Sequence, residues 1–505
     1  MKKEKFHRFS RTALWGIACL ACGAVFGINI LLLSKVAYDS TEQVSISWMP
    51  LQTIPLLAGI LLLTAAISQL DQGLERINQR KLFLLLSAID TVIALYFFLN
   101  IDPILRADAK AVHTSAQNMI AGIYTDVEKG GYLHRYPHQL GLTLYESILA
   151  RFSANPLCNM IVNFLMVLHI NYTCLRISEE LFHNKSVNLL TMLCSFAFLP
   201  QLFFTMFVYG LIPGFFCMFS GFYQALRFAK DRKAKNLVAL VLLCAGATVL
   251  KSNYSIGVLA IGIFLLLQLL KEKVSMKMVV TLVGVLLCLV VPNKLVTEYY
   301  EAKTGADLNQ GTPEILWLDM GTDIDNYTCI AGWYDESVYD IYTDAGHDRQ
   351  AAAQVGREKL KMNLVKIRQR PADAVKFFLI KIVSQWCDPL YQSLWSGPLE
   401  DLGQGIHSEL LKSLYHDQLP GVILTVLCKF VTLMIWLGAC VFLIFQGKKT
   451  EGWELFVMFF LGGLIFHTFW EGKSQYIYPY VFPLIPCAMG GIWELSQKMK
   501  RLFRQ

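Results

Sequence analysis

Charged residues are scarce in this chain: Asp, Glu, Lys and Arg make up 16% of its 505 residues, whereas 55% are hydrophobic. A soluble protein would carry about a quarter charged residues. The shortage excludes an ordinary soluble enzyme, and the apolar runs that recur along the chain indicate an integral membrane protein. The net charge of +7 does not indicate nucleic-acid binding, because the basic residues stand in short patches between apolar runs, as topology signals do.

Sequence motifs that are typical of soluble enzymes are also missing. The sequence has no Gly-rich phosphate loop, no HExxH, no GxSxG and no cytosolic nucleotide domain. Its 13 cysteines show no metal spacing and lie mostly in apolar runs, although Cys329 and Cys387 fall in a predicted outer region and could form a disulfide. We therefore expect no metal and no soluble nucleotide donor, which favours a lipid-linked substrate reached from within the bilayer.

Apolar segments predict an all-α polytopic membrane protein with about 12 transmembrane helices. The candidate spans are 12–34, 48–68, 82–100, 157–177, 187–206, 208–228, 236–251, 254–270, 278–297, 418–445, 452–470 and 476–495. The first is too long for a signal-peptide core and is expected to be a retained helix. With this number of spans every strongly basic loop falls on one side, which predicts that both termini are cytoplasmic and that the two large loops are extracytoplasmic.

These spans divide the chain into consecutive parts. We expect an N-terminal three-helix membrane segment at 1–100, a first extracytoplasmic loop at 101–156, a transmembrane helix bundle at 157–297, an extracytoplasmic loop domain with juxtamembrane helices at 298–417 and a C-terminal three-helix membrane segment at 418–505. No internal repeat or flexible linker separates them.

The second loop domain is divided by charge. Residues 298–348 hold twelve acids and one Lys, whereas residues 349–381 hold nine Lys or Arg and two acids. The basic half predicts a helix that stops before Pro371. The segment that follows Pro371 suits a helix lying on the membrane surface.

Asp108 lies about eight residues past the third predicted span, in "RADAKAVHTSAQN". With Val112 and Ala116 it would form one face of a short helix. Position alone indicates a solvated acid at a helix start. Its role therefore depends on which other polar groups the topology brings to the same side.

"YLHRYPHQLGL" follows in the same outer loop and holds Arg135 and His138, with His134 beside them. These residues could donate to a lipid phosphate near the membrane surface. An interfacial aromatic belt with a helix start at Pro137 would explain the stretch equally simply.

Two tight outer turns add further polar groups. "LKSN" puts Lys251 and Asn253 between two spans, where Lys251 is either a phosphate counter-ion or a snorkelling helix end. "EGKSQYIYPY" puts Glu471 and Lys473 on the same side. A channel or ion-coupled carrier would instead favour acids in the middle of spans, and Asp90 is the one clear case.

The order of these motifs resembles that of the polytopic glycosyltransferases of the GT-C superfamily, in particular the bacterial relatives of protein O-mannosyltransferases and lipid A aminoarabinose transferases. "VYG", "GTPEILWLDMG", "AGWYD" and "KIVSQWCDPLY" extend the resemblance, which covers most of the chain from about residue 100 onward. The resemblance implies that Asp108 is the catalytic base of an inverting transfer. The residues expected to bind substrate are Arg135, His138, Lys251, Asn253, Glu471 and Lys473.

The partners implied are a polyprenyl-phosphate sugar donor, membrane lipid, and a glycan, lipid or protein acceptor, with no cofactor, no metal and no nucleic acid. We expect the charge-divided outer domain to gather or orient the acceptor, with three aromatic residues that could stack on sugar faces: Trp317, Trp333 and Tyr334. Many GT-C enzymes carry paired acids in the first loop, whereas here Ala109 follows Asp108. The second acid is therefore Asp126, Glu128 or absent.

Two other functions fit parts of the same pattern. A polysaccharide polymerase or ligase would share the layout but depend on outer-loop Arg and His, here Arg349 and His347. A lipid-linked glycan transporter would move its ligand without covalent transfer, and the absence of repeated halves speaks mildly against it.

Overall fold

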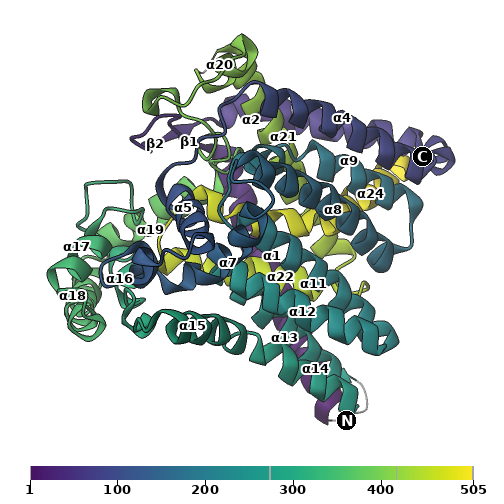
Figure 1. The fold of residues 1–505 in the computed structure, drawn as a ribbon. Coiled ribbons are helices and arrows are strands. Elements are labelled where there is room, and N and C mark those ends of the chain that lie inside the picture. The colour runs from purple at the N-terminus through teal and green to yellow at the C-terminus, as the bar shows by residue number, and fades with distance from the viewer. Residues whose placement is uncertain (1, 272–274, 417, 503–505) are drawn as a thin grey trace.

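The chain folds into a helical bundle with one short hairpin, seen in a computed structural model that describes residues 2–271, 275–416 and 418–502 (Figure 1). Its N-terminal part contains α1 (Lys2–Leu31), β1 (Leu32–Val36), β2 (Val44–Trp48), α2 (Pro50–Gln69), α3 (Asp71–Arg76) and α4 (Gln79–Leu99). The two strands pair antiparallel, with Leu32 opposite Trp48 and Val36 opposite Val44. Residues 37–43 therefore form the tip of a hairpin between the first two long helices.

The first outer loop is made of short helices: α5 (Ala107–Ile120), α6 (Tyr132–Arg135) and α7 (Leu140–Ala150). The chain is extended at Arg106, and Asp108 follows in the first turn of α5, where a negative charge interacts favourably with the helix dipole. Pro137 begins a 3₁₀ turn that ends at Gln139, because Pro fits the first position of a helix. The short helix predicted around Asp108 is confirmed, and it packs on α7.

The middle of the chain forms α8 (Leu157–Phe182), α9 (Lys185–Ala197), α10 (Pro200–Phe203), α11 (Leu211–Asp231), α12 (Ala234–Leu250), α13 (Ser255–Lys271), α14 (Met276–Leu287) and α15 (Val291–Thr304). The direction changes by 47° between α9 and α10 and by 44° between α14 and α15. Pro200 and Pro292 lie at these breaks, and each lacks the N–H that would continue the preceding helix.

The second outer segment contains α16 (Ile315–Met320), α17 (Ser337–Asp344), α18 (Arg349–Gln369), α19 (Pro371–Trp386) and α20 (Glu409–Tyr415). The carboxylate of Asp348 caps α18, accepting the backbone N–H of Gln350 at 2.8 Å and of Ala351 at 2.9 Å. The helix break predicted at Pro371 is confirmed. Cys329 and Cys387 are both free, so they do not form the disulfide that the sequence allowed.

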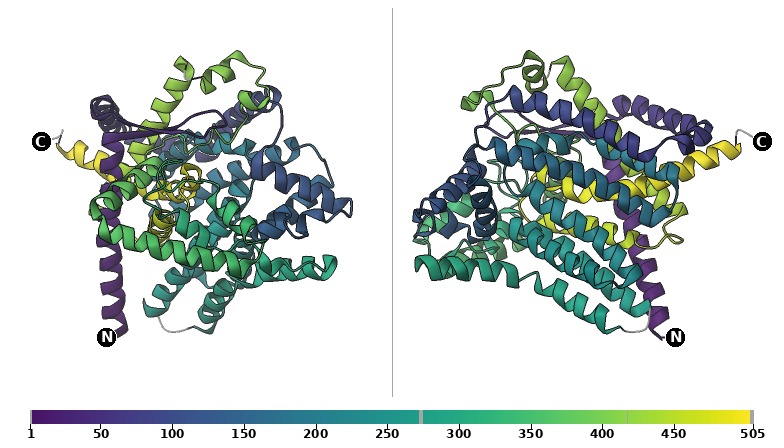
Figure 2. Two further views of the ribbon diagram at one scale, coloured as in Figure 1. Left: turned by 90° about the vertical axis from the view of Figure 1, so that its left-hand side faces the viewer. Right: turned by 45° about the vertical axis from the view of Figure 1, so that its right-hand side comes forward.

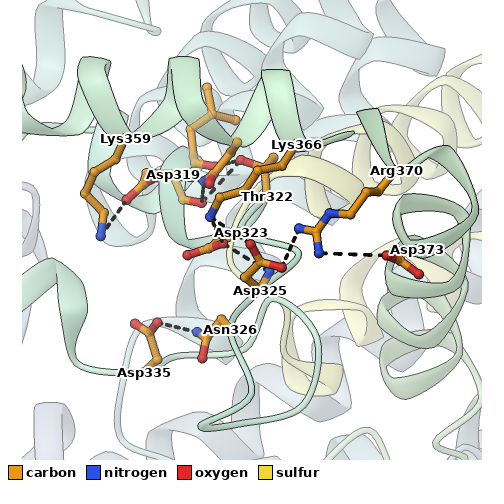
Figure 3. A network of polar contacts seen from close by, with 12 residues as sticks. Asp319, Thr322, Asp323, Asp325, Asn326, Asp335, Lys359, Lys366, Arg370 and Asp373 are labelled. Carbon is orange, nitrogen blue, oxygen red and sulfur yellow. Dashed lines mark hydrogen bonds and ion pairs between the residues drawn. The ribbon is translucent and has the colours of Figure 1, made fainter. Parts of the chain in front are cut away.

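The acidic and basic parts of this segment pair with each other (Figure 3). Acidic loop residues pair with basic residues of α18 and its C-terminal end: Lys366 Nζ lies 3.3 Å from Asp323 and 3.1 Å from Asp325, and Arg370 lies 2.5 Å from Asp325. The buried Asp319 accepts a hydrogen bond from Asn363 at 2.8 Å. We call Asp319, Asp323, Asp325, Lys359, Lys366 and Arg370 the outer network.

The C-terminal part contains α21 (Leu419–Phe445), α22 (Trp453–Phe469), α23 (Tyr478–Val481) and α24 (Ile485–Leu502). α21 and α24 pack on each other, and they also cover the N-terminal helices α1 and α2. Trp386, Trp436 and Phe460 form part of the shared core, with ring centroids 5.3–6.3 Å apart. The two ends of the chain thus build one bundle.

Among the described residues, six helices are long and apolar enough to cross a membrane, or up to eight if each bent pair counts as one span. The six are α1, α2, α4, α8, α13 and α21. α12 and α22 are apolar but shorter. The chain is therefore an all-α, multi-pass membrane protein.

Elements of the two predicted outer loops gather at one end of the bundle. Figure 1 shows α5, α16, α17 and α18 together at the end away from both labelled termini, and the right-hand view of Figure 2 shows the same arrangement from another side. Polar residues from loops far apart in sequence can therefore meet at this end.

Candidate functional site

A cavity of about 830 Å³ lies where these loops meet. Its walls come from the hairpin tip, the start of α5, the 3₁₀ turn after α6, the turns before α11 and α13, the outer segment and the turn after α22. Six predicted site residues line it: Asp108, His138, Lys251, Asn253, Glu471 and Lys473. Arg135 does not belong to this lining; its guanidinium lies 4.8 Å from the ring of Tyr339.

Asp108 presents a carboxylate with no cationic partner among the described residues. Its hydrogen-bond donor is the hydroxyl of Tyr209, at 3.3 Å. Ala107, just before it, has a left-handed φ of 46°, which is strained for a residue with a Cβ. Strain of this kind persists only where the surrounding structure enforces it. Arg106 and Asp108, on either side of Ala107, contact different walls of the cavity.

Lys251 follows the last residue of α12 and lines the same cavity. Its ammonium lies 4.7 Å from the ring centroid of Tyr209 and 5.5 Å from that of Tyr476. No carboxylate forms an ion pair with it in the described part of the chain. Two aromatic faces therefore hold the cation in place without cancelling its charge.

Tyr209 contacts both the acid and the cation. Its hydroxyl accepts a hydrogen bond from Gln139 at 2.5 Å while its ring faces Lys251. Gly210 follows with φ 65°, and a Cβ there would lie 2.5 Å from the carbonyl oxygen of Leu250. Only glycine allows this close approach, which brings Tyr209 beside the Lys251 turn.

The turn after α22 adds a second group of charges. Lys473 Nζ pairs with both carboxylate oxygens of Glu42, at 2.9 and 3.1 Å. Burial works to lower the pKa of Lys473, but the carboxylates of Glu42 and Glu471 outweigh it and raise that pKa. Burial also raises the pKa of Glu471 to about 7. Lys473 is thus a neutralised cation, unlike Lys251.

Glu42 and Arg106 are among the cavity residues that were missed in the sequence. Glu42 comes from the hairpin tip, where its φ of 52° is left-handed and its carboxylate also accepts a hydrogen bond from Gln392. Arg106 lies against the ring of Trp395, with 4.0 Å between guanidinium carbon and ring centroid. The only sequence signal for either was its location in a predicted outer loop.

His138 lines the cavity as a neutral group. Enclosure by the cavity walls and the charge of Lys251 lower the pKa of His138 to about 4, so that it carries no charge at pH 7. Its neutral ring can donate a hydrogen bond at one nitrogen and accept one at the other. His138 is therefore not the cationic donor that the sequence suggested. Trp317 lies edge-on to it at 6.4 Å.

The three aromatic residues expected to face a sugar divide between two roles. Trp317 and Tyr334 line the cavity. Trp333 does not: it is 3% exposed and its indole N–H donates to the hydroxyl of Ser384 at 2.9 Å. It joins α19 to the loops above and acts in packing.

A buried scaffold holds the turn after α22. Lys381 of α19 donates to the carbonyl oxygens of Gly321 and Trp470, both at 2.5 Å, and burial lowers the pKa of Lys381 to about 7. Asp388 accepts the hydroxyl of Ser474 at 2.8 Å. These bonds fix the backbone on both sides of Glu471 and Lys473.

Other candidate residues lie outside the cavity lining. Asp126 accepts hydrogen bonds from Ser115 and Asn118, at 2.8 and 3.4 Å, and neither Asp126 nor Glu128 lines the cavity. Arg349 and His347, which a ligase would use, do not line it either; Arg349 pairs with Glu314 at 2.5 Å. Within the described residues no three His, Cys, Asp or Glu side chains are placed to hold a metal ion.

No protein-family model, curated protein or solved structure matches the chain. The likeness to GT-C enzymes therefore stays a prediction from motifs. The side chains of the cavity themselves indicate which chemistry it can perform.

Proposed function

We propose that this protein is a GT-C-type membrane glycosyltransferase that moves a sugar from a polyprenyl-phosphate donor to an extracytoplasmic glycan, lipid or protein acceptor. One observation carries the proposal. Asp108 and Lys251 line one cavity, neither forms an ion pair with any described residue, and Tyr209 contacts both.

Glycosyl transfer with inversion needs a base and a cation that are not paired with each other. The attacking oxygen and the leaving phosphate lie on opposite sides of the anomeric carbon, so a base and a phosphate-binding cation must leave room for a sugar between them. A direct Asp108–Lys251 ion pair would fill that space and cancel both charges. Asp108 instead accepts the Tyr209 hydroxyl and Lys251 lies at the Tyr209 ring, so neither charge is used in an ion pair.

In the proposed reaction Asp108 takes the proton of the acceptor hydroxyl as its oxygen bonds to the anomeric carbon. The bond from that carbon to the phosphate oxygen breaks, and the polyprenyl phosphate leaves with one more negative charge. Lys251 stabilises this growing charge, and enclosure in the cavity strengthens the interaction relative to water. His138 and Asn253 can orient hydroxyl groups by neutral hydrogen bonds.

An apolar side of the cavity suits the lipid part of such a donor. Ile256 and Leu259 of α13 line it together with Phe466 of α22. Leu259 is also 46% exposed on a helix apolar enough to cross the bilayer. A polyprenyl chain could therefore lie along α13 with its phosphate at Lys251.

The proposed topology has 12 spans, cytoplasmic termini and an extracytoplasmic site. The short basic loops between spans support it, because each of them falls on the side of the termini. The gathering of both predicted outer loops at the end away from the termini is in keeping with it.

Reconstitution tests the reaction directly. Purified protein in nanodiscs would receive a panel of undecaprenyl-phosphate sugars with and without a mixture of glycan, peptide and lipid acceptors, and released undecaprenyl phosphate would be measured. We expect acceptor-stimulated release with at least one sugar. Movement of the donor between leaflets of proteoliposomes with no release of undecaprenyl phosphate would instead identify a transporter.

A further inference from the structure

The cavity holds a second cation whose role the transfer reaction leaves open. Arg106 lines it, only two residues before Asp108, and its Nη2 donates to the carbonyl oxygen of Trp395. Its Nε is buried without a partner, and no acceptor binds its Nη1 in the described part of the chain. Burial lowers the pKa of Arg106 to about 10, which leaves the guanidinium charged at neutral pH.

The carboxylates near Arg106 form their hydrogen bonds and ion pairs with other groups. Glu42 pairs with Lys473 at 2.9 Å, Asp102 pairs with His407 at 2.9 Å, and Asp401 accepts the backbone N–H of Ser40 at 2.8 Å. None of them lies within ion-pair distance of the guanidinium. Glu42 and Asp401 favour the charged form of Arg106 at longer range, but no carboxylate in the described part of the chain binds the guanidinium directly.

The planar guanidinium is stacked 4.0 Å from the Trp395 ring, and its Nη1 together with the second N–H of Nη2 can donate to an oxyanion, whereas Nε is enclosed. The phosphodiester of the proposed donor carries one charge, and Lys251 is available for it beyond Tyr209. The second free cation is thus left for the other substrate, beside the carboxylate that would deprotonate it.

We infer that Arg106 forms an anion subsite and that the acceptor carries a carboxylate or phosphate close to its accepting hydroxyl. That the anion belongs to the acceptor rests on the proposed function, but anion binding at Arg106 can be tested without any sugar transfer. The strained Ala107 between Arg106 and Asp108 holds the two side chains toward different walls, Trp395 and Tyr209, so that one acceptor can contact both.

Arg135 offers a matched control. Its guanidinium also lies over aromatic rings, at 4.8 Å from Tyr339 and 5.8 Å from Tyr136, and its Nε is also buried without a partner. The difference is that Arg135 does not line the cavity. Arg135→Gln removes the same kind of stacked arginine without touching the subsite.

The test is a titration of full-length protein in nanodiscs of zwitterionic lipid, at low salt and pH 7.5, with glucuronate, glucose 6-phosphate and glucose. Lys251→Gln isolates the Arg106 subsite, and the double variant with Arg106→Gln removes both. We expect Lys251→Gln to bind one or both anions but not glucose, and the double variant to bind them at least about tenfold more weakly. The anion that binds more tightly distinguishes carboxylate from phosphate.

Arg106→Lys keeps the charge without the planar fork and should bind with intermediate affinity, which guards against a misfolded glutamine variant. Arg135→Gln should bind like the wild type. If Lys251→Gln alone abolishes anion binding, the Arg106 subsite does not exist while the proposed donor site survives. If Lys251→Gln leaves all anion binding intact and only Arg106→Gln removes it, the donor site proposed at Lys251 fails instead.

Discussion

The outer network and the cavity contain the same kinds of side chain in opposite arrangements. In the outer network Lys366 lies 3.3 Å from Asp323 and 3.1 Å from Asp325, at the surface of the second outer segment. In the cavity Asp108 and Lys251 have no ion-pair partner among the described residues, although they share a contact with one tyrosine. Paired charges at a surface contribute little to stability. Asp108 is exposed, whereas burial lowers the pKa of Lys251 to about 8, so the enclosed charge of Lys251 is unfavourable unless a ligand or reaction uses it.

This contrast changes the interpretation of the charge pattern in the sequence. The sharp change from acidic to basic residues near position 349 was expected to gather or orient an acceptor. The structure pairs the acidic loops with α18 inside one segment (Figure 3), so the charge pattern has a structural explanation. The residues that point to chemistry are single charges spread along the chain.

The largest effect is expected from Asp108→Asn. The amide keeps the shape but cannot accept the acceptor proton, so the transfer rate should fall by about 10²–10⁴-fold. Release of undecaprenyl phosphate in nanodiscs measures it. Asp126→Asn, in the same loop but outside the cavity, is the control and should keep a near wild-type rate. Full activity of Asp108→Asn at normal protein levels would exclude Asp108 as the base. An equal loss in Asp126→Asn would mean that the reaction depends on both acids.

Lys251→Gln should follow, with a loss of about 10²–10³-fold in kcat, because a fixed charge would no longer stabilise the leaving phosphate. Lys303→Gln is a matched control, since the Lys303 ammonium also lies between two tyrosine rings, at 5.0 and 5.7 Å, outside the cavity lining. The same assay compares them. A similar loss in both variants would mean that the cation–aromatic contact acts through folding.

A smaller effect is expected for Glu471→Gln, and it depends on pH. Burial raises the pKa of Glu471 to about 7, so the side chain is mostly ionised at pH 8 and mostly neutral at pH 6. The ionised form repels the donor phosphodiester, whose charge is constant over this range. Donor affinity should therefore rise about fivefold from pH 8 to pH 6, equivalent to roughly 1 kcal/mol.

The glutamine variant should show a weaker pH dependence, which remains because burial lowers the pKa of Lys251 to about 8 and this cation gains charge over the same range. At pH 6 the variant should bind at the level of the wild type. Donor binding without acceptor, measured by titration at both pH values, separates the effect from the protonation of Asp108 in catalysis. A wild-type affinity that falls as the pH is lowered would show the opposite sign and exclude a repulsive role for Glu471.

The smallest effect is expected in the outer network. Lys366→Gln removes two contacts of a partly exposed lysine, which should lower the free energy of unfolding by less than about 1 kcal/mol and leave transfer unchanged. Thermal unfolding and the release assay, run together, measure both. A strong loss of activity with unchanged stability would contradict the division between paired structural charges and unpaired functional charges.

Much of the site was predictable because the topology alone gathers polar groups at one end of the bundle. Lys251, Asn253, Glu471 and Lys473 stand in turns between apolar helices, and such turns must lie at the ends of those helices. Arg135 is the exception among the predicted residues. Its short helix could be expected, but the stacking of its side chain on Tyr339 depends on α17, about 200 residues away in sequence.

The sequence by itself determined the helical, multi-pass character of the protein and the short helix that carries Asp108, because burial of apolar side chains repeats along a helix and can be recognised from neighbouring residues. Only the tertiary structure decided which charges are paired. Glu42 and Lys473 are 431 positions apart, and Asp108 and Tyr209 are 101 apart. Ion pairs and hydrogen bonds form over a few ångströms, so their partners depend on how all the helices pack. They cannot be recognised from neighbouring residues in the sequence.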